Sequence, residues 1–450
     1  MDNMEQVSFS DLNLIAPLNK ALKRIGYETP TPIQQKAIPL VLNGHDLLGI
    51  AQTGTGKTAA FCLPILDHLH KSTTRRQSQR PRSLILTPTR ELAIQIHENL
   101  REYGSDLSLT YSVIFGGVGQ TKQVKELRRG VDVLVATPGR LLDLIQQRYL
   151  NLDSVEVFVL DEADRMLDMG FMRDIKRILP MLPKKRHNLF FSATMPKEIQ
   201  KLAETILVRP KKVEVTPQAT TVEKIDQSVM FVEKKDKLNL LVHLLKDNKK
   251  QKTLVFVEMK HVANKVSEKL VKNGIGSSAI HGNKTQGARQ KAIKDFSQGN
   301  TNVLVATDIA SRGIDIDGIT HVINYELSNI AESYVHRIGR TARAGASGKA
   351  ISLVTGDEKS YLANVERVIK QKISVDKDQP YHSDVAENAK TTKVGAAKKK
   401  IEGDRRGPSR RGRGGNSNKP AGAKKSSVRK DGAKKNFGGK RSQAKPRAAK

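Results

Sequence analysis

Two adjacent carboxylates follow an apolar run in the first half of the chain. Residues 157–160 read VFVL, and such a run of β-branched and aromatic residues predicts a buried strand. Asp161 and Glu162 come directly after it, with Asp164 close behind. Ligands of open parallel sheets bind outside the carboxyl ends of the strands, so a metal ion held here could meet the phosphates of a nucleotide. Taken alone, an acidic run of this kind is more often a solvated loop or the start of a helix.

A glycine-rich loop upstream could cradle those phosphates. Residues 51–58 read AQTGTGKT and lie between a short apolar strand at 47–50 and a helical stretch. The glycines let the backbone curl so that its N–H groups point at phosphate oxygens. Lys57 would then reach the β- and γ-phosphates, and the Thr58 hydroxyl would ligate Mg²⁺.

The loop also has a competing interpretation. A strict phosphate loop begins with glycine, where this chain has alanine, and residues 54–59 loosely fit the dinucleotide fingerprint GxGxxA. The Lys57–Thr58 pair directly after the last glycine favours the phosphate loop. With that choice, Asp161 would hold Mg²⁺ opposite Thr58, partly through water, and Glu162 could orient and deprotonate the attacking water.

A cation for the developing charge on the γ-phosphate is also needed, and the second half of the chain offers one. Residues 336–343 read HRIGRTAR. Arg340 and Arg343 are three residues apart, so on a helix they share one face and can converge on a single ligand. The same spacing fits a solvated basic helix face, or a grip on the phosphates of a nucleic acid.

Alternating apolar strands and helical patterns would position these residues. The first group of predicted strands lies at 84–87, 111–115, 132–136, 157–160 and 189–191. Helical periodicity fills the gaps, as at 89–103 and 140–148. After a break, the second group of predicted strands lies at 228–232, 253–257, 277–280, 302–306, 320–324 and 350–354. Strands alternating with helices predict an α/β fold with parallel sheets.

The same pattern predicts the domain organisation. We expect two α/β domains of similar size, over residues 1–207 and 225–375, joined by a linker at 208–224 that is rich in Pro, Thr and charge. From residue 376 the alternation stops. The last sixty residues are mainly Lys, Arg, Gly, Ala, Ser and Asn, so they cannot bury enough apolar surface to offset chain entropy. We therefore predict that residues 376–450 form a disordered basic tail.

Charge points to a polyanionic partner. The chain has 78 Lys and Arg against 46 Asp and Glu, a net charge of +32. Residues 391–450 hold 21 of those cationic residues and three acidic ones, a net +18. The rest of the chain is also basic, which favours nucleic acid, with an anionic membrane surface as the second candidate. The Arg–Gly cluster at 405–415 predicts a flexible nucleic-acid-binding segment; the alternative is a solubilising tail.

Composition also limits the compartment. The single cysteine, Cys62, excludes an intramolecular disulfide framework and suggests a reducing environment; it lies in an apolar helical stretch, where a buried thiol is expected. No secretory signal and no apolar run long enough to span a bilayer are visible. We expect a soluble cytoplasmic protein without membrane attachment.

Together these motifs resemble those of DEAD-box RNA helicases, most of all the bacterial RhlE-like group. The resemblance covers about residues 8–370. It implies two tandem RecA-like domains that each supply part of one ATPase site, with ATP and Mg²⁺ as cofactors. It also implies an RNA-stimulated ATPase that unwinds short RNA duplexes locally.

The resemblance assigns further residues to the nucleotide. The family binds adenine through an N-terminal element, matched here by residues 26–34 (GYETPTPIQ) with Phe9 upstream. It implies that Gln34 reads the adenine edge and Tyr27 covers its face. Arg340 and Arg343 match the arginine fingers of the family. The other residues implied to contact nucleotide are Thr53, Gly54, Thr55, Gly56, Lys57, Thr58, Gly313 and Asp315.

Two further groups follow from the same resemblance. Residues matching the motifs that couple ATP hydrolysis to strand separation are Asp164, Ser192, Thr194 and His336. Residues matching RNA contacts are Arg90, Gly117, Thr137, Arg140, Gln286, Arg289 and Thr307. These are small, hydroxylic, amide or basic groups, which grip phosphates and 2′-hydroxyls rather than base edges and so predict sequence-independent binding.

The chain departs from the family pattern at two places. Residues 254–259 read LVFVEM, where many relatives end in a polar Asn–Thr-like pair, and Ser328 replaces a usual proline. The tail has no match to a folded RNA-binding domain.

Two rival functions stay open: an ATP-gated RNA clamp or scaffold with slow turnover, and a DNA helicase or translocase. The expected setting is a monomer, with ribosome assembly or RNA decay as possible contexts.

Overall fold

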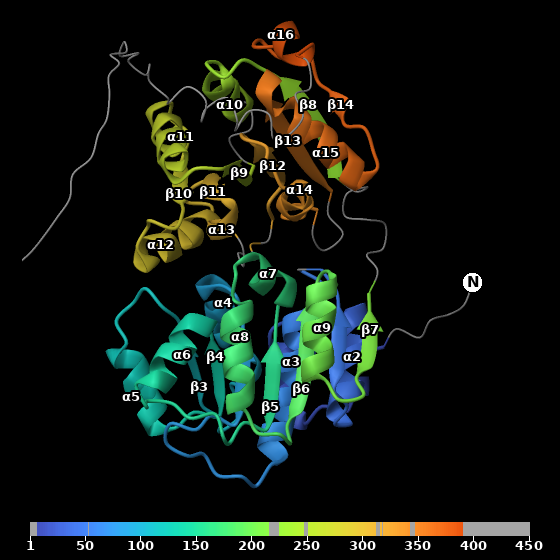
Figure 1. Cartoon of the computed structure of the whole chain (residues 1–450), viewed down its shortest axis with the longest axis vertical. Coiled ribbons are helices and arrows are strands. Elements are labelled where there is room, and N and C mark those ends of the chain that lie inside the picture. Colours follow the sequence, from blue (N-terminus) through green and yellow to red (C-terminus); the bar gives the residue numbers. More distant parts are fainter. Residues whose placement is uncertain are drawn as a thin grey trace, which may run out of the picture. The chain divides into compact units, whose positions relative to one another are not determined.

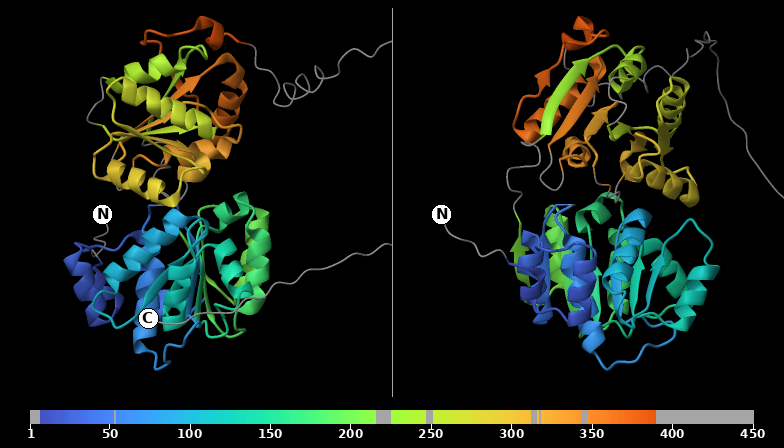
Figure 2. Two further views of the ribbon diagram at one scale, coloured as in Figure 1. Left: turned by 90° about the vertical axis from the view of Figure 1, so that its left-hand side faces the viewer. Right: turned by 180° about the vertical axis from the view of Figure 1, so that it is seen from behind.

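Two parallel sheets, each covered by helices on both faces, make up the described part of the chain (Figure 1). The computed structural model describes residues 7–52, 54–215, 225–246, 251–311, 316, 318–342 and 347–389. The two further views in Figure 2 show the same layering of helix, sheet and helix around each sheet. The predicted α/β architecture with parallel sheets is confirmed. The Arg–Gly cluster and the rest of residues 390–450 lie outside the described residues.

The first sheet has the strand order β3–β4–β2–β5–β6–β1–β7, and all its pairings are parallel. The strands are β1 Leu47–Ile50, β2 Ser83–Leu86, β3 Tyr111–Ile114, β4 Val133–Ala136, β5 Val157–Leu160, β6 His187–Ser192 and β7 Lys211–Glu214. The helices are η1 Phe9–Leu12, α1 Ala16–Arg24, α2 Pro32–Leu42, α3 Lys57–Lys71, α4 Arg90–Tyr103, α5 Thr121–Arg129, α6 Pro138–Gln146, α7 Ala163–Asp168, α8 Met172–Ile178, η2 Leu179–Met181 and α9 Lys197–Ile206.

Burial on both faces explains why the strands read as unbroken apolar runs. Val157 and Val159 of β5 belong to the core shared with α2, α3 and α4. Phe158 and Leu160 belong to the opposite core, shared with α6, α8 and α9. Successive side chains of a strand point to opposite faces, so a sheet covered on both sides needs an apolar residue at every position.

Strand order divides the carboxyl edge of the first sheet into two halves. The phosphate loop, the Asp161 run and Ser192 follow or end β1, β5 and β6, which are neighbours. The residues matched to RNA, such as Arg90 and Thr137, follow β2, β3 and β4, which are neighbours on the other half. The fold therefore gathers the two groups of motifs into two adjacent regions of one edge.

The second sheet repeats the plan with the order β10–β11–β9–β12–β13–β8–β14. Its strands are β8 Ile225–Phe231, β9 Thr253–Val257, β10 Ser277–Ile280, β11 Val303–Thr307, β12 His321–Asn324, β13 Gly348–Val354 and β14 Ser374–Val375. Its helices are α10 Lys237–Lys246, α11 Lys260–Lys272, α12 Gln286–Ser297, α13 Asp308–Ser311, α14 Ala331–Ile338, η3 Gly356–Glu358, α15 Lys359–Ile369 and α16 Asp384–Glu387.

Two predicted boundaries differ from the structure. The linker was expected at 208–224, but residues 211–214 form β7, an edge strand with only Val213 buried. The tail was expected from 376, yet Asp376 and Ser383 donate backbone hydrogen bonds to Val229 and Phe231 of β8. Backbone hydrogen bonds to a neighbouring strand hold these segments in place. The segments therefore need few buried apolar residues, and the sequence shows no strand pattern there.

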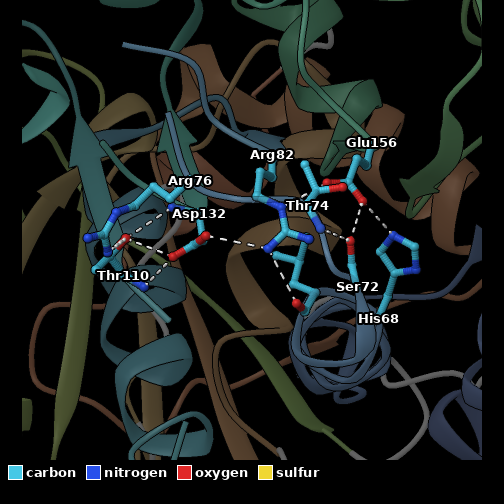
Figure 3. Close-up of polar contacts among 9 residues, drawn as sticks. His68, Ser72, Thr74, Arg76, Arg82, Thr110, Asp132 and Glu156 are labelled. Carbon is cyan, nitrogen blue, oxygen red and sulfur yellow. Dashed lines mark hydrogen bonds and ion pairs between the residues drawn. The ribbon is translucent and has the colours of Figure 1, made fainter. Parts of the chain in front are cut away.

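A polar network lies at the amino ends of β2, β4 and β5, away from the phosphate loop (Figure 3). Arg82 donates to Glu156 at 2.8 Å and lies 3.5 Å from Asp132. His68 of α3 lies 3.0 Å from the Glu156 carboxylate. Burial alone would raise the pKa of Glu156, but the hydrogen bonds from His68 and Arg82 outweigh it and lower that pKa. The network ties three strands and α3 together beneath the site.

Candidate functional site

The phosphate loop joins β1 to α3, and Gly56 is the residue that caps the helix. Its φ of +91° lies in the left-handed region, and a Cβ there would collide with the Gln34 side chain. Glycine therefore meets both the conformational and the steric demand of this turn. The loop brings the first turn of α3 to a wide cavity, which makes the helix N-terminus available to an anion.

Residues of the predicted adenine element hold the loop in place. The Thr31 hydroxyl donates to the Thr55 carbonyl at 2.8 Å, and Gln34 Nε2 donates to the Gly56 carbonyl at 3.1 Å. Gln34 Oε1 also accepts from the Thr31 backbone N–H at 2.8 Å. Both amide atoms of Gln34 thus bond to protein, so its contribution here is to tie the start of α2 to the loop.

Lys57 and Asp161 place opposite charges in a buried site. Lys57 is 6% exposed, and its Nζ donates to the Ala51 carbonyl at 2.6 Å. Burial lowers the pKa of Lys57, while the charges of Asp161 and Glu162 act against that shift. Burial also raises the pKa of Asp161, although the Lys57 charge opposes the change. An anionic ligand that bound Lys57 would relieve a costly buried cation.

Glu162 occupies an unusual backbone conformation. Its φ of +54° lies in the left-handed region, which is unfavourable for a residue with a side chain such as glutamate. Glu162 is also the residue that caps the start of α7. Its carboxylate accepts a hydrogen bond from Arg165 at 2.9 Å, and both side chains are nearly buried. Such a conformation costs about 1–3 kcal/mol, so the surrounding structure must hold Glu162 in this position at the cavity.

Asp164 lies against the residues that follow β6. Its carboxylate accepts from both the backbone N–H and the hydroxyl of Thr194, each at 2.9 Å. Its own N–H donates to the Ser192 hydroxyl at 3.2 Å, and that hydroxyl donates to the Thr194 carbonyl at 2.7 Å. The structure thus brings three predicted coupling residues into one hydrogen-bonded group beside the carboxylates of the cavity.

A cavity of about 480 Å³ collects most of the described residues that are predicted to contact the nucleotide. Phe9 and Tyr27 stack at one end of it, with ring centroids 6.0 Å apart. The predicted residues that line it are Phe9, Tyr27, Gln34, Gly54, Gly56, Lys57, Thr58, Asp161, Glu162 and Arg340. Arg340 comes from the segment after α14, so both domains contribute residues to the lining. Thr55 does not line it but anchors the loop through its carbonyl.

Two arginines of the second domain differ in their surroundings. Arg337 donates to both oxygens of Asp308, at 2.6 and 2.8 Å, and lies over the ring of Phe256. Arg340 lines the nucleotide cavity, and its Nε donates to the His336 carbonyl at 3.3 Å. His336 lines a second, small cavity that it shares with Arg165. Arg337 is therefore a structural anchor, whereas Arg340 faces the nucleotide residues.

The predicted RNA residues of the first domain lie at the carboxyl edge of the sheet. Arg90 packs against Gly117, where a Cβ would collide with its guanidinium and where φ is +79°. Arg140 Nη2 donates to the Val118 carbonyl at 3.0 Å, and Thr137 caps the start of α6 with extended backbone. These residues form a connected region of two guanidiniums, loop backbone and a hydroxyl.

The predicted RNA residues of the second domain are buried. Gln286 Nε2 and Arg289 Nε both donate to Glu91 Oε1, at 3.1 and 2.9 Å. Both side chains are buried, as is Thr307 at the end of β11. In this structure, Gln286 and Arg289 bond to a carboxylate of the first domain rather than offering those atoms to a ligand.

Several predicted residues have no structural description, and several important ones were not predicted. Thr53, Gly313, Asp315 and Arg343 lie outside the described residues. Arg165 and Glu91 were missed as partners of predicted residues, and Tyr103 was missed in the cavity. An arginine three residues after Glu162 on a helix is a signal that could have identified Arg165, because such side chains share a face. Glu91 directly follows Arg90 in the motif matched to RNA contacts, but its pairing with Gln286 and Arg289 arises from the tertiary fold, as does the place of Tyr103.

Comparison with known proteins supports the same assignment. The DEAD/DEAH box helicase family matches residues 31–202, and the helicase conserved C-terminal domain matches residues 236–345. Among the described residues, none of the helices combines the length and apolar character needed to cross a bilayer.

Curated relatives cover most of the chain. The DEAD-box ATP-dependent RNA helicase CshA of Bacillus subtilis (strain 168) is 42% identical over 367 residues, which span 82% of this chain and 73% of CshA. The ATP-dependent RNA helicase CshA of Listeria monocytogenes is 41% identical over 394 residues, spanning 88% of this chain and 74% of that protein.

A solved structure agrees in three dimensions. S. cerevisiae Dbp5 bound to RNA and ADP BeF3 is 31% identical and has a TM-score of 0.73, covering 82% of this chain and 95% of Dbp5. This likeness, with the two matched domains, confirms the predicted pair of RecA-like domains. The chain therefore belongs to the DEAD-box family of ATP-dependent RNA helicases.

Proposed function

We propose that this chain couples ATP binding and hydrolysis to local unwinding of RNA duplexes or remodelling of RNA–protein complexes. The observation that carries the proposal is the shared cavity, which gathers Lys57, Asp161 and Glu162 from the first domain and Arg340 from the second. A triphosphate there would meet a helix N-terminus, a buried lysine and an arginine, which is the charge set that phosphoryl transfer requires.

The chain's own side chains suggest how hydrolysis proceeds. Lys57 would exchange the Ala51 carbonyl for the β- and γ-phosphates. Glu162 would orient and deprotonate the attacking water once its pairing with Arg165 gives way. Arg340, with Arg343, would stabilise charge on the transferred phosphate. Thr58 and Asp161 both line the cavity and offer the oxygen ligands that Mg²⁺ prefers, so they would hold a Mg²⁺ ion that neutralises phosphate charge.

Coupling would run through Asp164. Its hydrogen bonds to Thr194 and to Ser192 join the end of β5 to the end of β6. A change at the γ-phosphate that moves Glu162 would therefore also move the segment after β6, since Asp164 lies on the same short helix. His336 belongs to the same proposed group, because it shares a cavity with Arg165, the partner of Glu162.

RNA would bind along the other half of the carboxyl edge. Arg90, Gly117, Thr137 and Arg140 offer guanidiniums, backbone and a hydroxyl, which suit phosphates and 2′-hydroxyls and not base edges. Gln286, Arg289 and Thr307 would join them from the second domain once RNA displaces the Glu91 contacts. If ATP and RNA each favour the same arrangement of the domains, each should tighten the binding of the other.

Narrower assignments are also proposals. The motifs support the RhlE-like group, while the curated relatives described above are named CshA. We propose domain limits near residues 1–207 and 225–375, extended to include β7 and residues 376–389, with Gly313 and Asp315 completing the nucleotide site. Action as a cytoplasmic monomer on ribosomal or RNA-decay complexes would fit a basic, sequence-independent RNA binder.

One observation favours the alternative of an ATP-gated RNA clamp with slow turnover. The buried ion pair between Glu162 and Arg165 engages the carboxylate of the proposed base. Turnover would be slow if ATP and RNA failed to break that pair.

The deciding experiment measures ATP hydrolysis with no nucleic acid, single-stranded RNA, duplex RNA and DNA. The helicase proposal predicts strong stimulation by RNA and little by DNA. Turnover that stays slow with every nucleic acid would support the clamp, and equal stimulation by DNA would point to a DNA helicase or translocase.

A further inference from the structure

Within the described residues, the outer edge of β3 is open at Val113. β3 is the end strand of the first sheet and pairs with β4. The carbonyls of Thr110 and Ile114 accept hydrogen bonds from the β4 side, from Val133 and Thr137. Backbone groups of alternate strand residues point to opposite sides. The outward N–H and C=O groups therefore belong to residues 111, 113 and 115.

Side chains close that edge on either side of Val113. The Gln123 amide accepts from the Phe115 N–H and donates to the Phe115 carbonyl, both at 3.2 Å. The His97 ring is hydrogen-bonded to the backbone of Tyr111. Among the described residues, no side chain bonds to the outward N–H or C=O of Val113. The N–H donor and the C=O acceptor of Val113 therefore remain available for pairing with another strand.

A groove of about 540 Å³ lies along this edge, between α4 and α5. Its floor is formed by Tyr111, Val113 and Phe115, and its rim includes Arg101 and Lys122. Both rim cations are exposed, and neither forms an ion pair within the described part of the chain. The rim carboxylate, Glu126, accepts a hydrogen bond from Ser112. The groove thus combines an open strand edge, an apolar floor and a positive rim.

We infer that this groove docks an extended acidic segment of a partner protein, which adds a strand beside β3. The N–H and C=O of Val113 would form main-chain hydrogen bonds, and alternate side chains of the segment would meet the apolar floor. Carboxylates of the segment would pair with Arg101 and Lys122. The chain's own residues 391–450 are excluded as the occupant, because their net charge of +18 would be repelled by this rim.

The position of the groove gives docking a consequence. Val118 lines the groove, and its carbonyl is the acceptor of Arg140, a proposed RNA residue. A bound segment would lie next to the loop containing Gly117. Single-stranded RNA could also be attracted by the cationic rim. An RNA backbone can supply a hydroxyl donor and a phosphate acceptor, but it lacks the aliphatic side chains that a strand would place on the apolar floor, so the groove favours a polypeptide.

The test uses hydrogen–deuterium exchange of the full-length chain, read by mass spectrometry over residues 111–115. The probe is a short synthetic peptide of alternating valine and glutamate. We expect a saturating amount of the probe to slow exchange in this segment by about tenfold, since strand pairing protects the Val113 amide. The same peptide with its central amides N-methylated carries the same charge but cannot pair, and should give no slowing. That control also accounts for binding of the peptide to the basic residues 391–450.

Charge variants complete the design. Arg101→Glu combined with Lys122→Glu should abolish the slowing, whereas Lys125→Glu should leave it unchanged. Lys125 is an exposed cation on the same helix that does not line the groove. No slowing with the peptide, or equal slowing with the N-methylated peptide, would overturn the inference. Slowing produced by an oligouridine RNA and not by the peptide would overturn it too, and would assign the groove to RNA.

Discussion

Lys57 and Asp161 show how burial prepares a residue for its ligand. Burying an ammonium or a carboxylate costs free energy. Burial therefore lowers the pKa of Lys57 and raises the pKa of Asp161, and both shifts favour the neutral form of the side chain. Within the described residues, the Ala51 carbonyl and nearby carboxylates compensate the charge of Lys57. A polyphosphate would compensate the charge of Lys57 more fully. Ligand binding should therefore also stabilise the site.

The first prediction concerns Lys57. Lys57→Ala removes a buried cation that lines the proposed phosphate site, so ATP hydrolysis should fall by at least about a hundredfold. Steady-state ATPase assays with saturating single-stranded RNA measure this directly. Substantial residual turnover would contradict the assignment of the site.

Arg340 gives a second prediction at the same scale. Arg340→Ala should leave ATP affinity within a few-fold of the wild type, because its proposed partner is charge that develops during transfer. RNA-stimulated turnover should fall by about a thousandfold. Equilibrium binding of a fluorescent ATP analogue and the ATPase assay separate the two effects.

The matched control for Arg340 is Arg337. Arg337→Ala breaks the contact with Asp308 and should lower the stability of the second domain, measured by thermal unfolding. Equal loss of ATP affinity and turnover in Arg340→Ala would argue that Arg340 is also a ground-state or structural residue.

At the scale of elements, the strength of the sequence signal follows burial. β2, β4 and β5 are buried at every position, and the predicted strands at 84–87, 132–136 and 157–160 agree with them to within one residue. β7 and β14 were not predicted, because an exposed edge strand shows no apolar run. Backbone pairing with a neighbour forms these strands, and that pairing is not visible in local sequence.

The site shows the same division. Lys57, Thr58 and Asp161 are recognisable because their chemistry fixes their spacing from a strand end or a glycine. The Arg165–Glu162 pair and the contacts of Glu91 with Gln286 and Arg289 depend on tertiary placement. The sequence therefore indicates the proposed catalytic groups, which line one cavity, more readily than the side chains that restrain them.

The polar network of Figure 3 gives a prediction at this scale. Arg82→Ala leaves the buried Asp132 and the half-buried Glu156 without their cation. Removing one partner of a buried ion pair is strongly destabilising, so the free energy of unfolding should fall by about 3 kcal/mol. Urea denaturation followed by circular dichroism measures the loss.

Arg177→Ala, which removes an exposed ion pair, should change stability by less than about 1 kcal/mol. Similar values for both variants would contradict a structural role of the network.

At the scale of the whole molecule, charge and site architecture act together. The carboxyl edge of the first sheet holds the nucleotide residues on one half and the proposed RNA residues on the other. Residues of the second domain reach both halves, through Arg340 and through Arg289. Any rearrangement of the two domains would therefore change both sites at once, and on this basis we propose that ATP and RNA binding are linked.

The basic residues 391–450 lead to the fourth prediction. Their deletion should weaken RNA affinity and flatten its salt dependence, because the segment carries a net +18. The slope of log K against log salt concentration should decrease by about one for each phosphate contact removed. RNA binding by fluorescence anisotropy over a salt series gives that slope. An unchanged slope would show that the segment does not contact RNA.

The most direct test of the central claim is strand separation of a short fluorescent RNA duplex by the full-length chain in the presence of ATP and Mg²⁺. We predict rapid, ATP-dependent separation by the wild type and none by Lys57→Ala. No strand separation, together with ATP hydrolysis that stays slow in the presence of RNA, would contradict the account and leave the chain as an ATP-gated RNA clamp.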